Sequence, residues 1–342
     1  MTKQFSNNFP CVAIALVALL GTSALFHAFL PPPIPEGVAA KLEFFAEHKD
    51  EFDTLFVGTS RFYYAVSPEI FDQITRENGV PTRTFNFGID GMHPPENFYV
   101  LEQILKTKPR NLKWVFVECE DVQTMWTPEV RDTRRVLYWH DWKRTLMIMK
   151  KTINPRGGAK WYGKIVRLWL AWRDVVTNLT LFAKRASNVG WVADFFSPQD
   201  GRSALQAELE LGPNRDGYRL AGPAMSAERA VRFQQKLADE ASASRTRFID
   251  PYAENGCRDS AAQIRQVGAE PIFVVTPVIW QSRYRFRNSP PPGPLLGFND
   301  SKAYPSLFDT KVRVDEGHLT KEGAEEFTRL LAREFVHQTR QP

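Results

Sequence analysis

Three short apolar runs, separated by segments with helical spacing, constrain the fold of this chain more than any other feature. The runs are Thr54 to Val57, Arg83 to Phe87 and Lys113 to Cys119. Between them, Phe62 to Gln73 and Pro95 to Lys106 show the apolar spacing of helices that cover a core. Strands that alternate with helices of this length form a mainly parallel sheet with helices on both faces, so the sequence predicts an α/β fold.

The alternation stops after the third run and returns near the C-terminus. The segment from about 134 to 222 contains no strand pattern, and we expect it to be a large helical insertion. Helices at 227–241 and about 252–267 follow it, and then a buried strand at 270–276. The sequence thus predicts one α/β domain over residues 37–342, interrupted by the insertion.

Residues 1–36, before this domain, have the pattern of a membrane anchor and a stem. Pro10 to Leu30 carries no charge, and an apolar run of about 20 residues can cross a bilayer. Lys3 precedes the run and no Lys or Arg follows until Lys41, so we expect a single-pass inner-membrane protein whose domain is extracytoplasmic, in the periplasm. Pro31 to Pro35 is typical of a stiff stem. A cleaved signal peptide is the rival interpretation.

The overall charge argues against nucleic acid as a partner. The chain has 44 basic and 39 acidic residues, for a net charge of +5, and no long basic block. No pair of histidines has the spacing of metal ligands on a helix, so we expect no metal and no cofactor. The three cysteines do not define a disulfide framework, although a Cys119–Cys257 bond would be compatible with an extracytoplasmic domain.

Polar residues near both ends of the predicted domain have the pattern of a serine acyl-transfer site. Ser60 comes two residues after Gly58, at the end of the first strand, which is where open α/β sheets bind ligands. Asp315 and His318 lie three residues apart, just before a C-terminal helix. Taken alone, Ser60 would also fit the N-cap of a helix. Asp315 and His318, taken alone, would also fit an ordinary surface turn. Together they predict Ser60 as nucleophile, His318 as base and Asp315 as the group that orients His318.

The same motifs resemble those of the SGNH (GDSL-like) hydrolase superfamily. Gly58 to Ser60 resembles the block that carries the nucleophile, and Asp315 to His318 resembles the last block. Residues 86–91 resemble the second block, in which Gly91 would donate its backbone N–H to the oxyanion. The resemblance covers about 53–332, apart from the insertion, and implies a flavodoxin-like sheet.

One block of this family pattern is missing. The family has an asparagine after the third strand, and its side chain donates to the oxyanion, whereas Glu118 to Gln123 contains none. One such donor is typically worth about 3 kcal/mol of transition-state stabilisation. Gln123 is the predicted substitute donor. The carboxylates of Glu118 and Glu120 would oppose a developing negative charge unless they are turned away or paired.

The anchor, the central insertion and the last block, which His318 to Ala324 extends, resemble those of membrane-anchored SGNH proteins that act on cell-envelope polymers. This resemblance implies an O-acyltransferase or O-acetylesterase acting on an envelope polysaccharide, with a multi-pass membrane acyltransferase as a possible partner. The sequence leaves open whether the acyl acceptor is water or a sugar hydroxyl. The missing asparagine favours the alternative, a non-catalytic SGNH-like envelope protein that binds polysaccharide or a membrane acyltransferase.

Within the insertion, residues 159–184 carry aromatic and aliphatic side chains at helical spacing: Trp161, Ile165, Leu168, Trp169, Trp172 and Val176. Two interpretations fit this pattern. One is an amphipathic helix that lies on the outer surface of the membrane. The other, which we favour from sequence, is an ordinary helix packed on the catalytic domain with its aromatic side chains buried.

Overall fold

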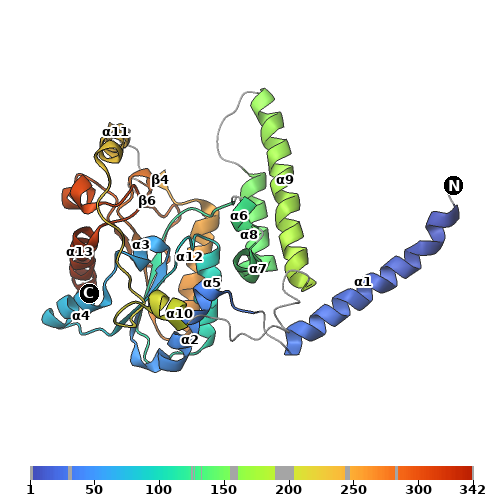
Figure 1. Cartoon of the computed structure of the whole chain (residues 1–342), viewed down its shortest axis with the longest axis horizontal. Helices are drawn as coiled ribbons and strands as arrows, with labels where there is room; N and C mark the ends of the chain where they lie inside the picture. Colours follow the sequence, from blue (N-terminus) through green and yellow to red (C-terminus); the bar gives the residue numbers. More distant parts are fainter. Residues whose placement is uncertain are drawn as a thin grey trace. The chain divides into compact units, whose positions relative to one another are not determined.

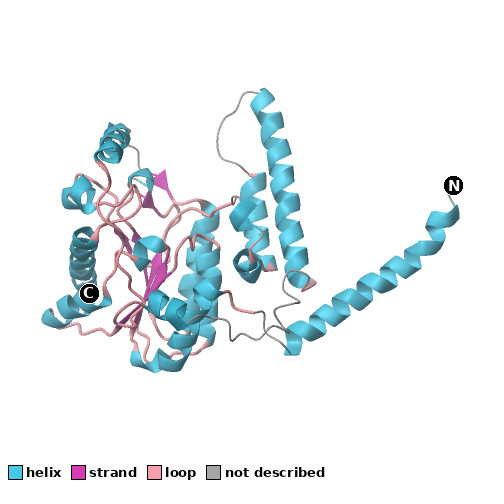
Figure 2. Cartoon of the chain, in the orientation of Figure 1, coloured by secondary structure: helices cyan, strands magenta, loops and turns pink. Residues whose placement is uncertain are grey.

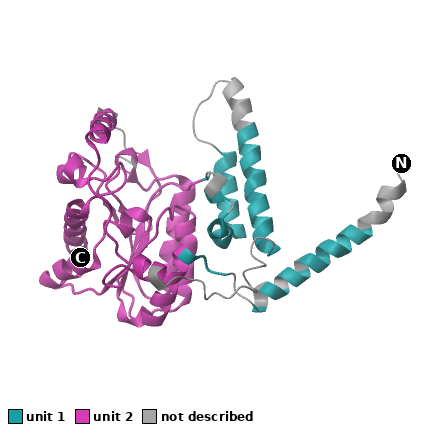
Figure 3. Ribbon diagram, viewed as in Figure 1, with its two compact units in different colours: residues 1–36, 124–202 teal, residues 37–123, 203–342 magenta. Residues whose placement is uncertain are grey.

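The chain divides into two compact units, which are coloured separately in Figure 3. Unit 1 comprises residues 1–36 and 124–202, and unit 2 comprises residues 37–123 and 203–342. The helical unit thus begins and ends earlier than the insertion predicted at 134–222. The computed structural model describes residues 3–29, 33–124, 126, 128–131, 133–154, 161–188, 204–242, 247–281 and 284–340. Pro31 and Pro32 of the predicted stem lie outside these ranges.

Unit 2 is built on a five-stranded sheet in which every pairing is parallel (Figures 1 and 2). The strand order is β2-β1-β3-β5-β7. The strands are β1 (Thr54–Gly58), β2 (Thr84–Gly88), β3 (Trp114–Glu118), β5 (Glu270–Val275) and β7 (Leu295–Gly297). Strands β4 (Arg247–Phe248) and β6 (Tyr284–Arg285) form a separate parallel pair. The predicted α/β class with a mainly parallel sheet is therefore confirmed.

Helices cover both faces of this sheet. They are α2 (Glu36–His48), α3 (Ser60–Tyr63), α4 (Pro68–Glu77), α5 (Glu96–Lys106), α10 (Ala204–Leu211), α11 (Ala227–Ser242), α12 (Pro251–Gln266) and α13 (Lys321–Thr339). Short 3-10 turns occur at Lys49–Glu51, Ile279–Gln281, Pro305–Phe308 and Thr310–Val312. Several helices begin at the caps that the sequence signals. Ser67 accepts a hydrogen bond from the backbone of Ile70 and precedes Pro68, and Asp250 caps α12 in the same way.

Alternate residues of each strand point to opposite faces, and this builds two cores. On one face, Phe56 and Phe116 stack at 4.3 Å between their ring centroids, and Phe71 of α4 and Phe335 of α13 pack over them. On the other face, α5 and α12 pack together. There the free thiols of Cys119 and Cys257 lie 3.6 Å apart, and burial raises the pKa of the Cys119 thiol.

Unit 1 is helical in its described parts. Its helices are α1 (Lys3–Phe29), α6 (Pro128–Arg131), α7 (Arg134–Trp139), α8 (Trp142–Ile153) and α9 (Trp161–Ala186). Among the residues that the structure describes, no helix combines the length and the apolar character needed to cross a membrane, so the predicted transmembrane helix finds no support there.

Helix α9 corrects one expectation from the sequence. The prediction that its aromatic side chains are buried is wrong for Trp169 and Trp172, which are 63% and 68% exposed. The side chains of Trp161, Ile165 and Leu168 lie outside the described part of the structure.

Candidate active site

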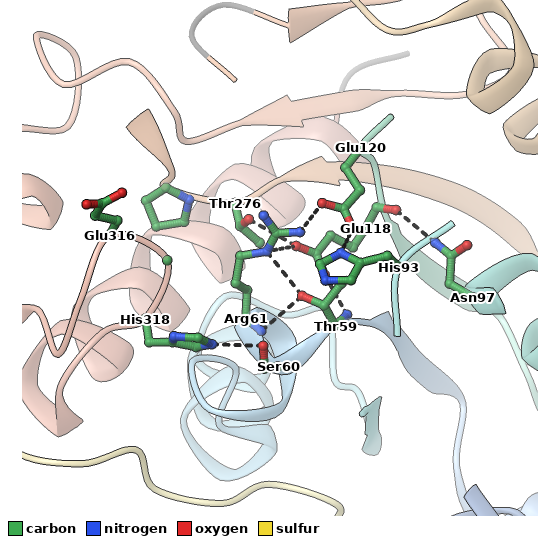
Figure 4. Close-up of polar contacts among 12 residues, drawn as sticks. Thr59, Ser60, Arg61, His93, Asn97, Glu118, Glu120, Thr276, Glu316 and His318 are labelled. Carbon is green, nitrogen blue, oxygen red and sulfur yellow. Dashed lines mark hydrogen bonds and ion pairs between the residues drawn. The ribbon is translucent and has the colours of Figure 1, made fainter. Parts of the chain in front are cut away.

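A tight turn at the carboxyl end of β1 carries Ser60 into the first turn of α3 (Figure 4). Thr59 caps this helix, because its Oγ1 accepts a hydrogen bond from the backbone N–H of Arg61 at 3.1 Å. Gly58 is required by close packing, since a Cβ there would lie 2.7 Å from Glu118 Cβ. Strand β1 pairs with β2 on one side and β3 on the other, so Ser60 lies at the topological switch point of the sheet.

A second turn, Asp315 to His318, is shaped by its own hydrogen bonds. Asp315 Oδ1 accepts from the backbone N–H groups of Gly317 at 2.7 Å and His318 at 2.8 Å. The N–H of Val314 donates to the carbonyl oxygen of His318 at 3.0 Å, which closes the turn from the other side. The turn therefore has a defined shape before any contact with Ser60 is counted.

Arg313 holds this turn to the core. Its side chain is fully buried, and its guanidinium donates to the carbonyl oxygens of Leu307, Pro277 and Glu316 at 2.7, 2.6 and 3.1 Å. Burial is the main cause that lowers the pKa of Arg313 to about 10, so the group stays charged at neutral pH. The burial of Arg313 could not be predicted from the sequence, because the local pattern is the same as that of a solvent-exposed arginine in a loop.

The two turns bring the three predicted catalytic side chains together. His318 Nε2 lies 2.8 Å from Ser60 Oγ, and His318 Nδ1 lies 2.9 Å from both carboxylate oxygens of Asp315. Burial opposes ionisation of Asp315, but hydrogen bonds from His318 and from the Gly317 N–H outweigh it and lower the pKa to about 2.

The protonation of His318 follows from its neighbours. An ionised Asp315 has only acceptors, so Nδ1 of His318 must carry a proton and donate it. In the neutral ring Nε2 is then an acceptor, and the Ser60 hydroxyl donates to it. This is the arrangement that general-base activation of a serine requires.

Glu118, the last residue of β3, and Glu120, which follows the strand, both have paired carboxylates. Arg61 Nε lies 2.6 Å from Glu118 Oε1, and Arg61 also forms an ion pair with Glu120, which in turn contacts His93 (Figure 4). We call Arg61, Glu118, Glu120 and His93 the buried ion cluster, although His93 is half-exposed. Glu118 also accepts from the Thr59 backbone N–H at 2.6 Å, so the cluster is bonded directly to the turn that carries Ser60.

Within the cluster, the pKa of Glu120 is lowered and the pKa of His93 is raised, so the charged form of each is favoured. Burial opposes ionisation of Glu120, but the Arg61 charge and the His93 hydrogen bond lower its pKa to about 2. Burial also opposes protonation of His93, but its hydrogen bond to Glu120 raises its pKa above the ordinary value. The negative charges that would oppose an oxyanion are thus matched by Arg61 and, when it is protonated, by His93.

The backbone N–H groups of Ser60 and Gly91 are the two candidate backbone donors for an oxyanion hole. Within the described residues, no hydrogen bond from the backbone N–H of Ser60 or of Gly91 is found. Gly91 adopts a left-handed φ of +64°, which favours glycine in this turn after β2. The backbone N–H of Gln123 donates to Pro94 at 2.7 Å, and the role of its side-chain amide as an oxyanion donor stays a prediction.

A cavity of about 590 Å³ opens beside His318 and Asp315. Phe233 and Trp280 form apolar parts of its wall, and α11 adds the basic side chains Arg229, Arg232 and Lys236. Its volume falls within the range of about 300–1,000 Å³ that is usual for small-molecule sites. Asp315 and His318 therefore border a space of the size that a small molecule occupies, whereas Ser60 is not one of its lining residues.

Neither a metal site nor a known relative helps to assign the site. In the described ranges, no group of three or more His, Cys, Asp or Glu side chains is arranged to hold a metal ion. No protein-family model matches the sequence, and no curated protein matches it either. The functional assignment therefore depends on the geometry of the site.

Proposed function

We propose that this protein is an acyl-transfer enzyme of the SGNH type, with Ser60 as its nucleophile. The chain of contacts from Ser60 Oγ through the His318 ring to the Asp315 carboxylate carries the proposal. The cavity beside His318 and the pairing of Glu118 and Glu120 by Arg61 support it.

In the first half of the proposed reaction, Ser60 Oγ attacks the carbonyl carbon of an ester and its proton passes to His318 Nε2. Asp315 stabilises the imidazolium that forms. The backbone N–H groups of Ser60 and Gly91 donate to the oxyanion of the tetrahedral intermediate. The intermediate then expels the alcohol, which takes the proton from His318, and the acyl group stays on Ser60.

In the second half, His318 takes a proton from the acceptor, whose oxygen attacks the acyl-enzyme. The proton returns to Ser60 as the ester bond to the enzyme breaks. A water acceptor makes the protein an esterase, and a sugar hydroxyl makes it a transferase. The resemblance to membrane-anchored SGNH proteins supports an O-acyltransferase or O-acetylesterase of a cell-envelope polysaccharide, with a multi-pass membrane acyltransferase as partner.

We also propose that the N-terminal segment holds the protein at the inner membrane, with unit 2 on the extracytoplasmic side. This part rests on the sequence, namely the uncharged run from Pro10 to Leu30 and the lysine that precedes it.

One observation favours a second candidate, a non-catalytic SGNH-like protein that binds an envelope polysaccharide or a membrane acyltransferase. Both carboxylates at the end of β3 are committed to the buried ion cluster, and no asparagine follows this strand to donate to an oxyanion. The intact contact between Ser60 and His318 speaks against this candidate.

Turnover of an aryl acetate, with and without a sugar acceptor, tests the proposal. We expect the wild-type chain to release the aryl alcohol and Ser60→Ala to lose about a thousandfold or more of that rate. Ser67→Ala, which removes a cap of α4 away from the site, is the matched control. Acylated sugar among the products indicates a transferase, and free acetate alone indicates an esterase. Equal rates for wild type and Ser60→Ala would reject the enzyme.

A further inference from the structure

Helix α9 carries a row of exposed apolar side chains along one face. The row consists of Trp169, Trp172, Val176 and Leu179, which recur at intervals of three or four residues. Among the described residues of the helix, the buried side chains are Val175, Asn178 and Leu181. Large apolar side chains gathered on one exposed face mark a surface that contacts a partner or a membrane.

The neighbouring helix α8 also exposes large apolar side chains. His140, Arg144 and Thr145 are buried at the end of α7 and the start of α8, whereas Trp142 and Ile153 of α8 are exposed. Burial is the main cause that lowers the pKa of His140 to about 3, so the ring is neutral in this interior. Unit 1 thus buries these polar side chains among apolar ones such as Trp139 and Ile148, and it leaves several large apolar side chains exposed.

Helix α1 of the same unit contacts the C-terminal end of α9 and also exposes apolar side chains. The Ser23 hydroxyl of α1 donates to the carbonyl oxygen of Ala186, and the Asn188 side chain donates to Ser23 Oγ at 3.0 Å. Along α1, the side chains of Ile14, Val17 and other aliphatic residues are also exposed. Two helices of one unit therefore present apolar side chains outward and are joined by polar contacts.

Residues 124–202 are more basic than the rest of the chain. Residues 124–202 contain fifteen Lys and Arg but only six Asp and Glu, a net charge of +9, while the whole chain carries +5. The remainder is therefore net negative. A segment with this net positive charge and exposed tryptophans suits the interface of a bilayer with anionic headgroups, where Trp is enriched and each basic side chain adds attraction.

We propose that the outer face of α9, defined by Trp169, Trp172, Val176 and Leu179, binds the surface of an anionic lipid bilayer. The helix lies along the interface, with its tryptophans at the level of the headgroups, and does not cross the membrane. The contact is independent of the acyl-transfer proposal, because it involves unit 1 and none of the residues of the candidate active site.

Site-directed fluorescence on the full chain tests this contact. In a Cys11→Ser background, where Cys119 and Cys257 are buried, the environment-sensitive dye NBD is attached through Trp172→Cys or through Gln234→Cys on exposed α11. The probe is a vesicle of phosphatidylcholine and phosphatidylglycerol that contains doxyl-labelled lipid. We expect quenching and a blue shift at position 172 and neither at position 234. Equal water exposure at both positions would overturn the proposal.

A second measurement covers the case in which labelling disturbs α9. With vesicles, hydrogen exchange of α9 peptides should slow in the wild-type chain, and the double variant Trp169→Glu/Trp172→Glu should lose this protection, since apolar contact is lost and two charges oppose the anionic lipid. This readout is local to α9, so it does not depend on how the N-terminal segment binds. Val231→Glu, which places one such charge at an exposed apolar position of unit 2, should keep the protection of α9. Equal protection of α9 in the double variant and wild type would overturn the proposal and point to a protein partner for this face.

Discussion

Arg61→Met tests whether the buried ion cluster holds the turn that carries Ser60, the proposed nucleophile. The substitution removes the one side chain that is bonded to both Glu118 and Glu120, whose side chains are 1% and 8% exposed. Met has a similar length and no charge, so packing is largely kept while two buried carboxylates lose their main counterion. Thr59, Thr276 and His93 keep their contacts with these carboxylates.

The size of the effect follows from this burial. Removing one partner of a buried ion pair typically costs about 3–5 kcal/mol, because an uncompensated charge is left in the interior. The contacts from Thr59, Thr276 and His93 still partly compensate the two carboxylates. We therefore expect the lower end of this range, a loss of about 3 kcal/mol in the free energy of unfolding. With a urea m-value of about 2–3 kcal/mol/M, the midpoint should shift down by about 1–1.5 M.

The assay is urea denaturation, with pulsed hydrogen exchange on peptides from β1 and β3 so that unit 2 is followed by itself. Arg83→Met is the matched control. Its ion pair with Glu51 is exposed, with the two side chains 62% and 46% accessible, so it should cost less than about 1 kcal/mol. If Arg61→Met costs no more than Arg83→Met, the cluster does not stabilise the turn and the reasoning fails.

Three further predictions follow from the site. Asp315→Asn should lower kcat by about 10⁴, because the amide no longer holds the required tautomer of His318, and steady-state kinetics with unchanged circular dichroism would check this. The pKa of His93 is raised on folding, so protonated His93 stabilises the fold at pH values below its unfolded pKa of about 6.5. This stabilisation is lost as the pH rises through the pKa of the folded state. Between pH 6 and 9 the melting temperature should therefore fall less in His93→Gln than in wild type. A Cβ at Gly58 would lie 2.7 Å from Glu118, so Gly58→Ala should cost about 1–3 kcal/mol in urea denaturation, whereas Gly37→Ala, with open space around it, should cost nothing.

The sequence predicts the central strands well because each is buried on both faces. The ranges expected for β1, β2, β3 and β5 agree with the structure to within about a residue at most ends. Strand β7 was not predicted. Its three residues follow a proline-rich stretch and are too few to show a period, so it forms because β5 offers an open edge for pairing.

The contact between Ser60 and His318 was predictable for a different reason. Ser60 follows a strand end and His318 has a nearby carboxylate, and both are local patterns. The ion cluster has no local pattern, since Arg61 meets Glu118 only through the pairing of β1 with β3. The burial of Arg313 and the exposure of Trp169 likewise depend on packing, which the period of a helix does not reveal.

Covalent labelling by a fluorophosphonate tests the central claim, a serine activated by His318, most directly. After incubation of the full chain, peptide mass spectrometry locates the adduct. We predict a single adduct on Ser60 in the wild type, and loss of that adduct in both Ser60→Ala and His318→Ala. An unlabelled wild type that nevertheless turns over aryl acetate, or labelling of Ser60 that persists at the same rate in His318→Ala, would contradict the account.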